Sequence, residues 1–147
     1  VHAGGGPEML MRAAEAVAEA SGGKTRIIAV TVLTSLDDSD LATVGQQGPA
    51  AEQVLRLAKL AQQQCCHGVV CSPAEVAMLR REMGPDFDLV VPGIRPAGAD
   101  AQDQKRIMTP KDAMTAGATA LVIGRPITGA ADPGEAARAI AASMAWP

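Results

Sequence analysis

The chain is almost without aromatic side chains, because Phe87 and Trp146 are the only two among 147 residues. It also has no excess of positive charge, since 13 Lys and Arg residues oppose 16 Asp and Glu residues for a net charge of −3. Proteins that bind nucleic acid usually combine a basic surface with stacking rings. The composition therefore argues against a nucleic-acid-binding role.

Long apolar runs are absent as well. The longest strongly apolar run, residues 27–33, is far shorter than the roughly 20 residues that a membrane-spanning helix needs. The first residues lack the basic and apolar regions of a secretory signal. We therefore expect a cytoplasmic protein without membrane contacts, in which residues 1–147 form a single domain.

Cysteines are few and do not have the spacing of a disulfide framework. Cys65, Cys66 and Cys71 are an odd number, which fits a reducing compartment. His67 lies beside them, but the adjacent Cys65 and Cys66 cannot easily both reach one metal ion. We predict buried or half-buried thiols and no metal site.

Strand-like and helix-like patterns alternate along the rest of the chain. Strands are predicted at 26–33, 68–71, 89–91 and 120–123, and residues 1–3 have the composition of the end of another strand. Helices are predicted over 49–64 and after the start signals at 72–75, 109–112 and 132–135. Such alternation predicts an α/β fold with a sheet of about five parallel strands.

Two of the predicted helices have a clear buried face. The expected core positions are Val54, Leu57, Ala58 and Ala61 in the first, and Val76, Leu79 and Met83 in the second. The second helix also carries a capping-box pattern, with Ser72 before Pro73 and Glu75 three residues after the serine.

Glycine and arginine recur just after the last two predicted strands. Gly93 and Arg95 follow residues 89–91, and Gly124 and Arg125 follow residues 120–123. Glycine lets a backbone approach a ligand closely, and a guanidinium matches a phosphate with two hydrogen bonds. A (β/α) barrel commonly builds its phosphate site after its last two strands. An open doubly wound sheet is the alternative, but the only glycine cluster near its expected phosphate turn is residues 4–6.

Several motifs, in order and in spacing, closely resemble the orotidine 5′-phosphate decarboxylase family. The matching segments are VHA with two glycines at 1–6, AVTVLTS at 29–35, GVVCS at 68–72, PGIRP at 92–96, DQ with RIMTP at 103–110 and GRPIT at 124–128. The resemblance covers essentially the whole chain. It implies a partial (β/α)8 TIM barrel in which this chain supplies strands four to eight.

The resemblance also implies a function and a set of binding residues. The family converts orotidine 5′-phosphate to UMP in de novo pyrimidine biosynthesis, without a metal or an organic cofactor, and forms homodimers when full length. By its pattern Gln104 and Arg125 hold the 5′-phosphate beside the Gly124 backbone. Arg95 belongs to the same binding face, and the Thr34 hydroxyl contacts the substrate near its base.

No catalytic residue is assigned in this chain. The family carries an Asp-x-Lys-x-x-Asp motif after the third barrel strand, and the motif does not occur here. Residues 103–105 match its first three positions, but Met108 stands where the second aspartate should be. We therefore expect the isolated chain to be inactive, with residues 97–104 forming a lid over the phosphate.

Two other functions remain open at this point. The chain could be a non-catalytic half-barrel that serves as a binding or assembly module, which the missing lysine motif allows. It could also belong to another sugar-phosphate decarboxylase or isomerase barrel, although the joint spacing of Thr34, Arg95, Gln104 and Arg125 argues against this.

Overall fold

The computed structural model describes residues 1–96 and 108–144. Its sheet contains β1 (Ile28–Val30), β2 (Gly68–Val70), β3 (Asp88–Val91) and β4 (Ala120–Leu121), all parallel and in that order. The parallel α/β fold predicted from the sequence is confirmed. Gln104 and the predicted lid at 97–104 lie outside the described residues.

The first predicted strand is reduced to a single bridge. His2 pairs with Val30 in a parallel bridge, and the Val30 amide donates to the Val1 carbonyl oxygen at 2.8 Å. Within the described residues the sheet therefore has four strands, and this bridge stands where a fifth strand was expected.

β1 is shorter than predicted at both ends, covering Ile28–Val30 instead of 26–33. At its carboxyl end the pairing with β2 finishes at Thr31. The amide and the hydroxyl of Thr31 both donate to the Val70 carbonyl oxygen, at 3.2 and 2.7 Å, and the chain then turns with a Leu36 amide bond to the Leu33 carbonyl oxygen at 3.0 Å.

Helices cover one face of the sheet. Ala29, Val69 and Leu89 pair in register and are fully buried, and α3 (Ala50–Gln63) and α4 (Val76–Met83) contact β2 and β3 respectively. On the next register row, Val30 and Val70 are only half-buried. The predicted helix faces are confirmed except at Leu57, which is partly buried.

The predicted helix starts are also confirmed. In the segment η2 (Pro73–Glu75), the Glu75 carboxylate accepts from both the amide and the hydroxyl of Ser72, the amide bond measuring 3.1 Å. Thr109 caps α5 (Pro110–Thr115), and Asp132 caps α7 (Pro133–Ser143). These side chains satisfy amide groups that a helix leaves unpaired at its start.

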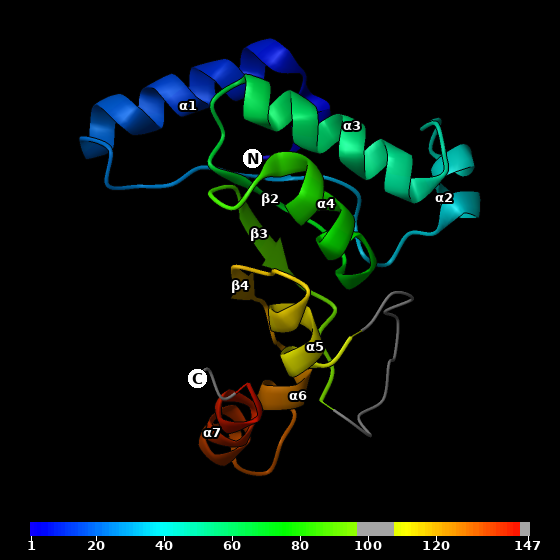
Figure 1. The fold of residues 1–147 in the computed structure, drawn as a ribbon, viewed down its shortest axis with the longest axis vertical. Coiled ribbons are helices and arrows are strands. Elements are labelled where there is room, and N and C mark those ends of the chain that lie inside the picture. The colour runs from blue at the N-terminus through cyan, green and yellow to red at the C-terminus, as the bar shows by residue number, and fades with distance from the viewer. Residues whose placement is uncertain (97–107, 145–147) are drawn as a thin grey trace.

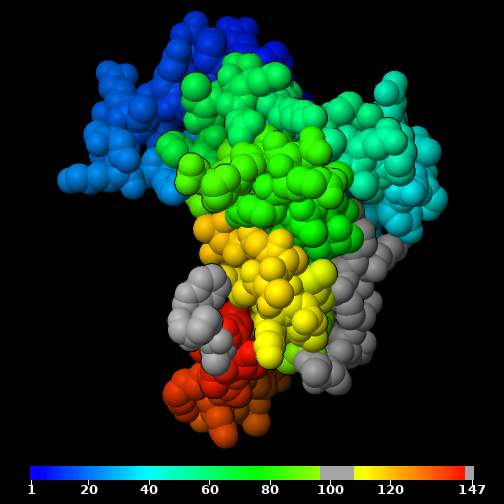
Figure 2. Space-filling model, viewed as in Figure 1, coloured from blue at the N-terminus to red at the C-terminus, as the bar shows by residue number. Residues whose placement is uncertain are grey.

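Three helices and one short turn were not anticipated. They are α1 (Pro7–Ser21), α2 (Asp38–Thr43), α6 (Arg125–Thr128) and the 3-10 turn η1 (Ala3–Gly5). α1 contacts α3 at one end of the molecule, whereas α5, α6 and α7 gather at the other end (Figure 1). The space-filling view shows α7 projecting at that end, below the surface formed by α3 and α4 (Figure 2).

None of the helices within residues 1–96 and 108–144 has the length and apolar character required to cross a membrane.

Candidate functional site

The predicted binding residues follow the carboxyl ends of three different strands. Thr34 follows β1, Arg95 follows β3, and Gly124 with Arg125 follows β4. Because all four strands are parallel, these ends share one edge of the sheet, where a (β/α) barrel places its active site. Arg95 and Arg125 follow the neighbouring strands β3 and β4. Thr34 follows β1, which lies at the other side of the sheet.

Arg95 is hydrogen-bonded at this edge through its side chain and its amide. Its side chain is buried, its Nη1 donates to the Ile94 carbonyl oxygen at 2.8 Å, and its amide donates to the Met108 carbonyl oxygen at 3.0 Å. Ile94 and Met108 also form a parallel bridge. Gly93 permits the bend before this segment because its φ of 75° is a conformation that other residues rarely adopt.

Gly124 and Arg125 lie at an open point of the surface. Gly124 precedes α6, and apart from its chain neighbours no atom of the described residues lies within 4 Å of the position that a β-carbon on it would occupy. Its carbonyl oxygen accepts from the amides of Ile127 and Thr128 at 2.8 and 3.0 Å, which fixes the turn. Arg125 is the first residue of α6 and is exposed. A ligand can therefore approach this backbone and this guanidinium together.

Thr34 is buried, at 9% exposure. The apolar residue beside it, Leu33, was not predicted to belong to the site. Leu33 is 48% exposed, and Val122, just after β4, is 51% exposed. Single exposed apolar side chains are common on protein surfaces, so neither residue is assigned to the site.

The cysteines differ in environment. Cys66 and Cys71 are buried as predicted, but Cys65 is exposed, which corrects the expectation that all three would be at least half-buried. It follows the end of α3 and has a φ of 60°, so it lies in the turn and not in the core. Burial raises the pKa of the Cys66 thiol. Among the described residues, no three His, Cys, Asp or Glu side chains are placed to hold a metal ion.

An apolar hollow of about 520 Å³ lies between β4 and the helices α5, α6 and α7. Its lining includes Met114, Leu121, Ile123, Ile127 and Ile140. The described lining has no charged side chain, so it offers nothing to hold a phosphate.

Comparison with known proteins settles the family. The model of the orotidine 5′-phosphate decarboxylase / HUMPS family matches residues 1–140. The chain belongs to this family. The resemblance inferred from the motifs is thereby confirmed.

Individual members of the family show how much of a barrel the chain spans. It is 56% identical over 144 residues to orotidine 5′-phosphate decarboxylase of Thermobifida fusca, matching 98% of this chain and 60% of that protein. It is 58% identical over 134 residues to the enzyme of Neisseria meningitidis serogroup A, matching 90% and 54%. The crystal structure of the Lactobacillus acidophilus enzyme superposes with a TM-score of 0.82 at 41% identity, over 99% of this chain and 62% of that one. The fold is therefore part of a (β/α)8 barrel.

Proposed function

We propose that this chain supplies the phosphate- and base-binding part of an orotidine 5′-phosphate decarboxylase, which forms UMP in pyrimidine biosynthesis. The observation that carries the proposal is the placement of Arg95 and Gly124 with Arg125 after adjacent strands β3 and β4. These correspond to the last two strands of a (β/α) barrel, where phosphate sites are commonly built. A cytoplasmic location and a homodimer of the full barrel belong to the same proposal.

Within this proposal the residues have separate tasks. Arg125 is exposed and begins a helix next to an open glycine, so a phosphate dianion can reach its guanidinium from solvent. Gln104 adds a neutral donor from outside the described residues. Thr34 contacts the substrate near its base, and the buried Arg95 contributes positive charge to the same edge.

Binding at these residues supports a reaction that takes place elsewhere on the substrate. Loss of carbon dioxide from the pyrimidine leaves a poorly stabilised carbanion, and contacts with a remote phosphate help to favour its formation. The sequence contains no Asp-x-Lys-x-x-Asp motif. The proton donor must then come from the part of the barrel that this chain does not span.

The edge of the sheet at β4 supports the proposal that further strands complete the barrel. Within the described residues β4 pairs only with β3, and the apolar hollow beside it is open. The chain spans 60% of the Thermobifida fusca enzyme. We propose that the remaining barrel segments pair with β4 and cover this hollow.

A second candidate is another sugar-phosphate decarboxylase or isomerase barrel, because the matching family model is not restricted to orotidine 5′-phosphate decarboxylase. Such an enzyme would bind the phosphate of its substrate at the same edge of the sheet, but the rest of the substrate would differ. The curated relatives named above, at 56% and 58% identity, are both orotidine 5′-phosphate decarboxylases, which favours the first candidate.

The phosphate assignment is tested in a joined barrel, in which this chain replaces the matching 60% of the Thermobifida fusca enzyme. Arg125→Ala removes a charged hydrogen-bond donor worth roughly 1.5–3 kcal/mol, so kcat/KM for orotidine 5′-phosphate should fall by about 10- to 150-fold. The loss should nearly vanish with a substrate that lacks the phosphate.

Arg138→Ala, at an exposed position of α7, is the matched control and should change kcat/KM by less than about twofold. Equal losses by Arg125→Ala on the phosphorylated and phosphate-free substrates would make Arg125 structural and refute this placement of the phosphate.

A further inference from the structure

The two faces of the sheet differ in what covers them. In β3, Leu89 and Val91 are buried on the side of the helices, whereas Asp88 and Val90, which alternate with them, are only half-buried. Successive residues of a strand point to opposite faces of a sheet. We call the half-buried side the inner face. Its register rows are Ile28, Gly68 and Asp88, and then Val30, Val70 and Val90.

The inner face is the side of the sheet that a closed barrel encloses. The Lactobacillus acidophilus enzyme superposes on 99% of this chain, but more than a third of that enzyme lies outside the match, which covers 62% of it. In the proposed completion of the barrel, those further segments cover the inner face. The interior of a (β/α)8 barrel is usually packed with branched apolar side chains, and the row of Val30, Val70 and Val90 fits this rule.

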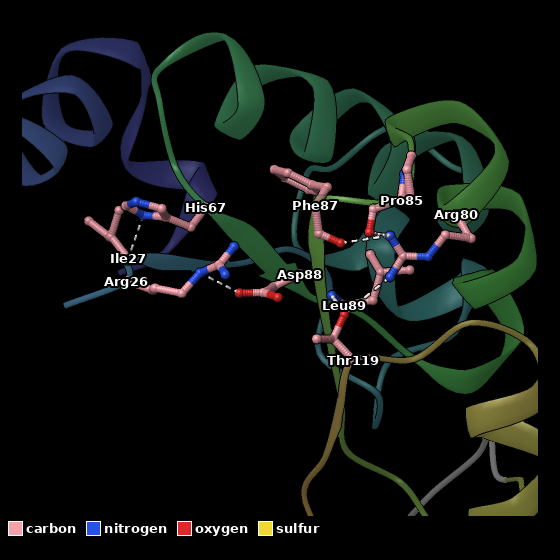
Figure 3. Close-up of polar contacts among 9 residues, drawn as sticks. All are labelled: Arg26, Ile27, His67, Arg80, Pro85, Phe87, Asp88, Leu89 and Thr119. Atoms are coloured by element: carbon pink, nitrogen blue, oxygen red, sulfur yellow. Dashed lines mark hydrogen bonds and ion pairs between the residues drawn. The ribbon is translucent and has the colours of Figure 1, made fainter. Parts of the chain in front are cut away.

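The end of the inner face at the start of the strands carries charge instead. Nε of Arg26, two residues before β1, lies 2.8 Å from Oδ2 of Asp88 in β3, and Figure 3 shows the guanidinium directed at this carboxylate. Because β2 lies between β1 and β3, the ion pair joins two strands that are not neighbours. Gly68, in register with Asp88, has no side chain where the pair crosses β2.

Hydrogen bonds hold the backbone next to both partners. The His67 amide donates to the Ile27 carbonyl oxygen at 2.9 Å, and the Ile27 amide donates to Nδ1 of His67 at 3.0 Å, directly after Arg26. The His67 carbonyl oxygen accepts from the Asp88 amide at 2.9 Å. The Asp88 side chain is only 15% exposed. Its carboxylate is therefore largely withdrawn from water already, and it depends on the charge of Arg26.

The guanidinium of Arg26 is only partly satisfied. A guanidinium has five N–H donors, and among the described residues its ion pair with Asp88 engages Nε alone. The Arg26 side chain is 53% exposed, so water can reach Nη1 and Nη2 in this chain. Segments that cover the inner face remove this water, and a covered guanidinium destabilises the fold unless its N–H groups keep hydrogen-bond acceptors.

We propose that Arg26 and Asp88 form a charged layer inside the completed barrel. The segments that this chain does not span place hydrogen-bond acceptors against Nη1 and Nη2 of Arg26, and pack apolar side chains on Val30, Val70 and Val90. A segment that is apolar throughout does not match this surface. The inference rests on the proposed completion of the barrel but not on the substrate, because the layer lies at the edge of the sheet opposite the proposed binding residues.

Thermal unfolding of the joined barrel tests the charged layer. Arg26→Met leaves the Asp88 carboxylate covered and uncompensated, so the midpoint should fall by roughly 6–20 °C. Arg81→Met is the matched control, because Arg81 pairs with Glu82 on α4 and its side chain is 74% exposed, and its midpoint should change by less than about 4 °C. Adding Asp88→Asn to Arg26→Met removes the uncompensated charge and should restore most of the lost midpoint.

Arg26→Lys tests the acceptors for Nη1 and Nη2. Lysine keeps a positive charge beside Asp88 but lacks the planar fork of donors, so this variant should regain only part of the midpoint lost in Arg26→Met. Full recovery in Arg26→Lys, or equally small shifts in Arg26→Met and Arg81→Met, would overturn the proposal.

Chemical modification of the unaltered joined barrel gives a measurement that does not depend on a variant folding. Phenylglyoxal modifies accessible guanidinium groups, and mass spectrometry reports the extent at each arginine. Arg81 should be modified and Arg26 protected; modification of Arg26 as fast as Arg81 would overturn the proposal. None of these readings uses turnover, so a folded joined barrel that lacks decarboxylase activity but protects Arg26 would refute the proposed function and leave the charged layer standing.

Discussion

The guanidinium of Arg80 donates twice to the carbonyl oxygen of Gly117, from Nε at 3.1 Å and from Nη2 at 2.7 Å. Nη1 of the same side chain donates to the carbonyl oxygens of Gly84, Pro85 and Phe87, at 2.7, 3.0 and 2.8 Å. One arginine on α4 thus joins the segments that lead into β3 and β4 (Figure 3). Gly117 suits this role because a side chain there would meet the Arg80 stem at 2.9 Å.

Replacing Arg80 should therefore destabilise the chain. Arg80→Ala leaves several carbonyl oxygens without a charged donor, and we expect the free energy of unfolding to fall by about 2–4 kcal/mol. Urea denaturation measures the change. Arg81→Ala is the control on the same helix, since the Arg81 side chain is 74% exposed, and a change above about 0.5 kcal/mol is not expected there. Similar losses in both variants would contradict the role given to Arg80.

Gly68, the first residue of β2, should tolerate no side chain. A β-carbon at this position would collide with the carbonyl oxygen and the β-carbon of Asp88 on the neighbouring strand. Because this contact is with backbone, it cannot be relieved by a change of rotamer. We expect Gly68→Ala to lower the free energy of unfolding by about 3 kcal/mol.

Gly4→Ala provides the comparison for Gly68. Among residues 1–96 and 108–144, no atom apart from the chain neighbours lies within 4 Å of the position that a β-carbon on Gly4 would occupy, and the φ of Gly4 is not in the left-handed region. Its stability should change by less than about 0.5 kcal/mol. A neutral Gly68→Ala variant would show that β2 and β3 do not pack closely at this residue.

The buried thiol of Cys66 should make the fold less stable at alkaline pH. Burial raises its pKa in the folded state, so the folded chain keeps a proton that the unfolded chain loses above the ordinary thiol value of about 8.5. Stability from this group is complete below that value and declines as the pH rises through it. In a Cys65→Ser background, the unfolding midpoint should fall from pH 8 to pH 10, and the additional change Cys66→Ala should reduce that fall. An identical pH dependence in both proteins would contradict this.

The elements best predicted from the sequence are those fixed by local chemistry. The start of α4 followed from Ser72 and Glu75, and the buried face of the helix followed from the spacing of Val76, Leu79 and Met83. The strands β2 and β3 followed from short β-branched runs between polar turns. Here the local preference and the tertiary packing agree.

The errors at β1 and α1 have different causes. β1 ends early because the chain turns soon after Thr31, where the Leu36 amide donates to the Leu33 carbonyl oxygen at 3.0 Å. α1 was not predicted because glycines occupy residues 4–6, directly before it. Pro7 in its first turn and Gly22 at its end, with a φ of 57°, are nevertheless recognisable start and stop signals. The acceptor role of His67 and the hydrogen bonds of Arg80 to carbonyl oxygens are determined by tertiary structure, and no sequence pattern indicates them.

The candidate site was predicted mainly by resemblance to a family. Thr34, Arg95, Gly124 and Arg125 follow strand ends, but only the fold shows that Arg95 is buried while Arg125 is exposed. Their roles toward the substrate stay a prediction, as does that of Gln104.

The most direct test of the proposed function is decarboxylation of orotidine 5′-phosphate by the joined barrel and by this chain alone. The joined barrel combines the residues assigned here to phosphate and base binding with the barrel segments that this chain does not span. We predict conversion to UMP by the joined barrel and no turnover by the chain alone. Turnover by the chain alone, or a folded joined barrel that neither binds nor converts the substrate, would contradict the proposed function.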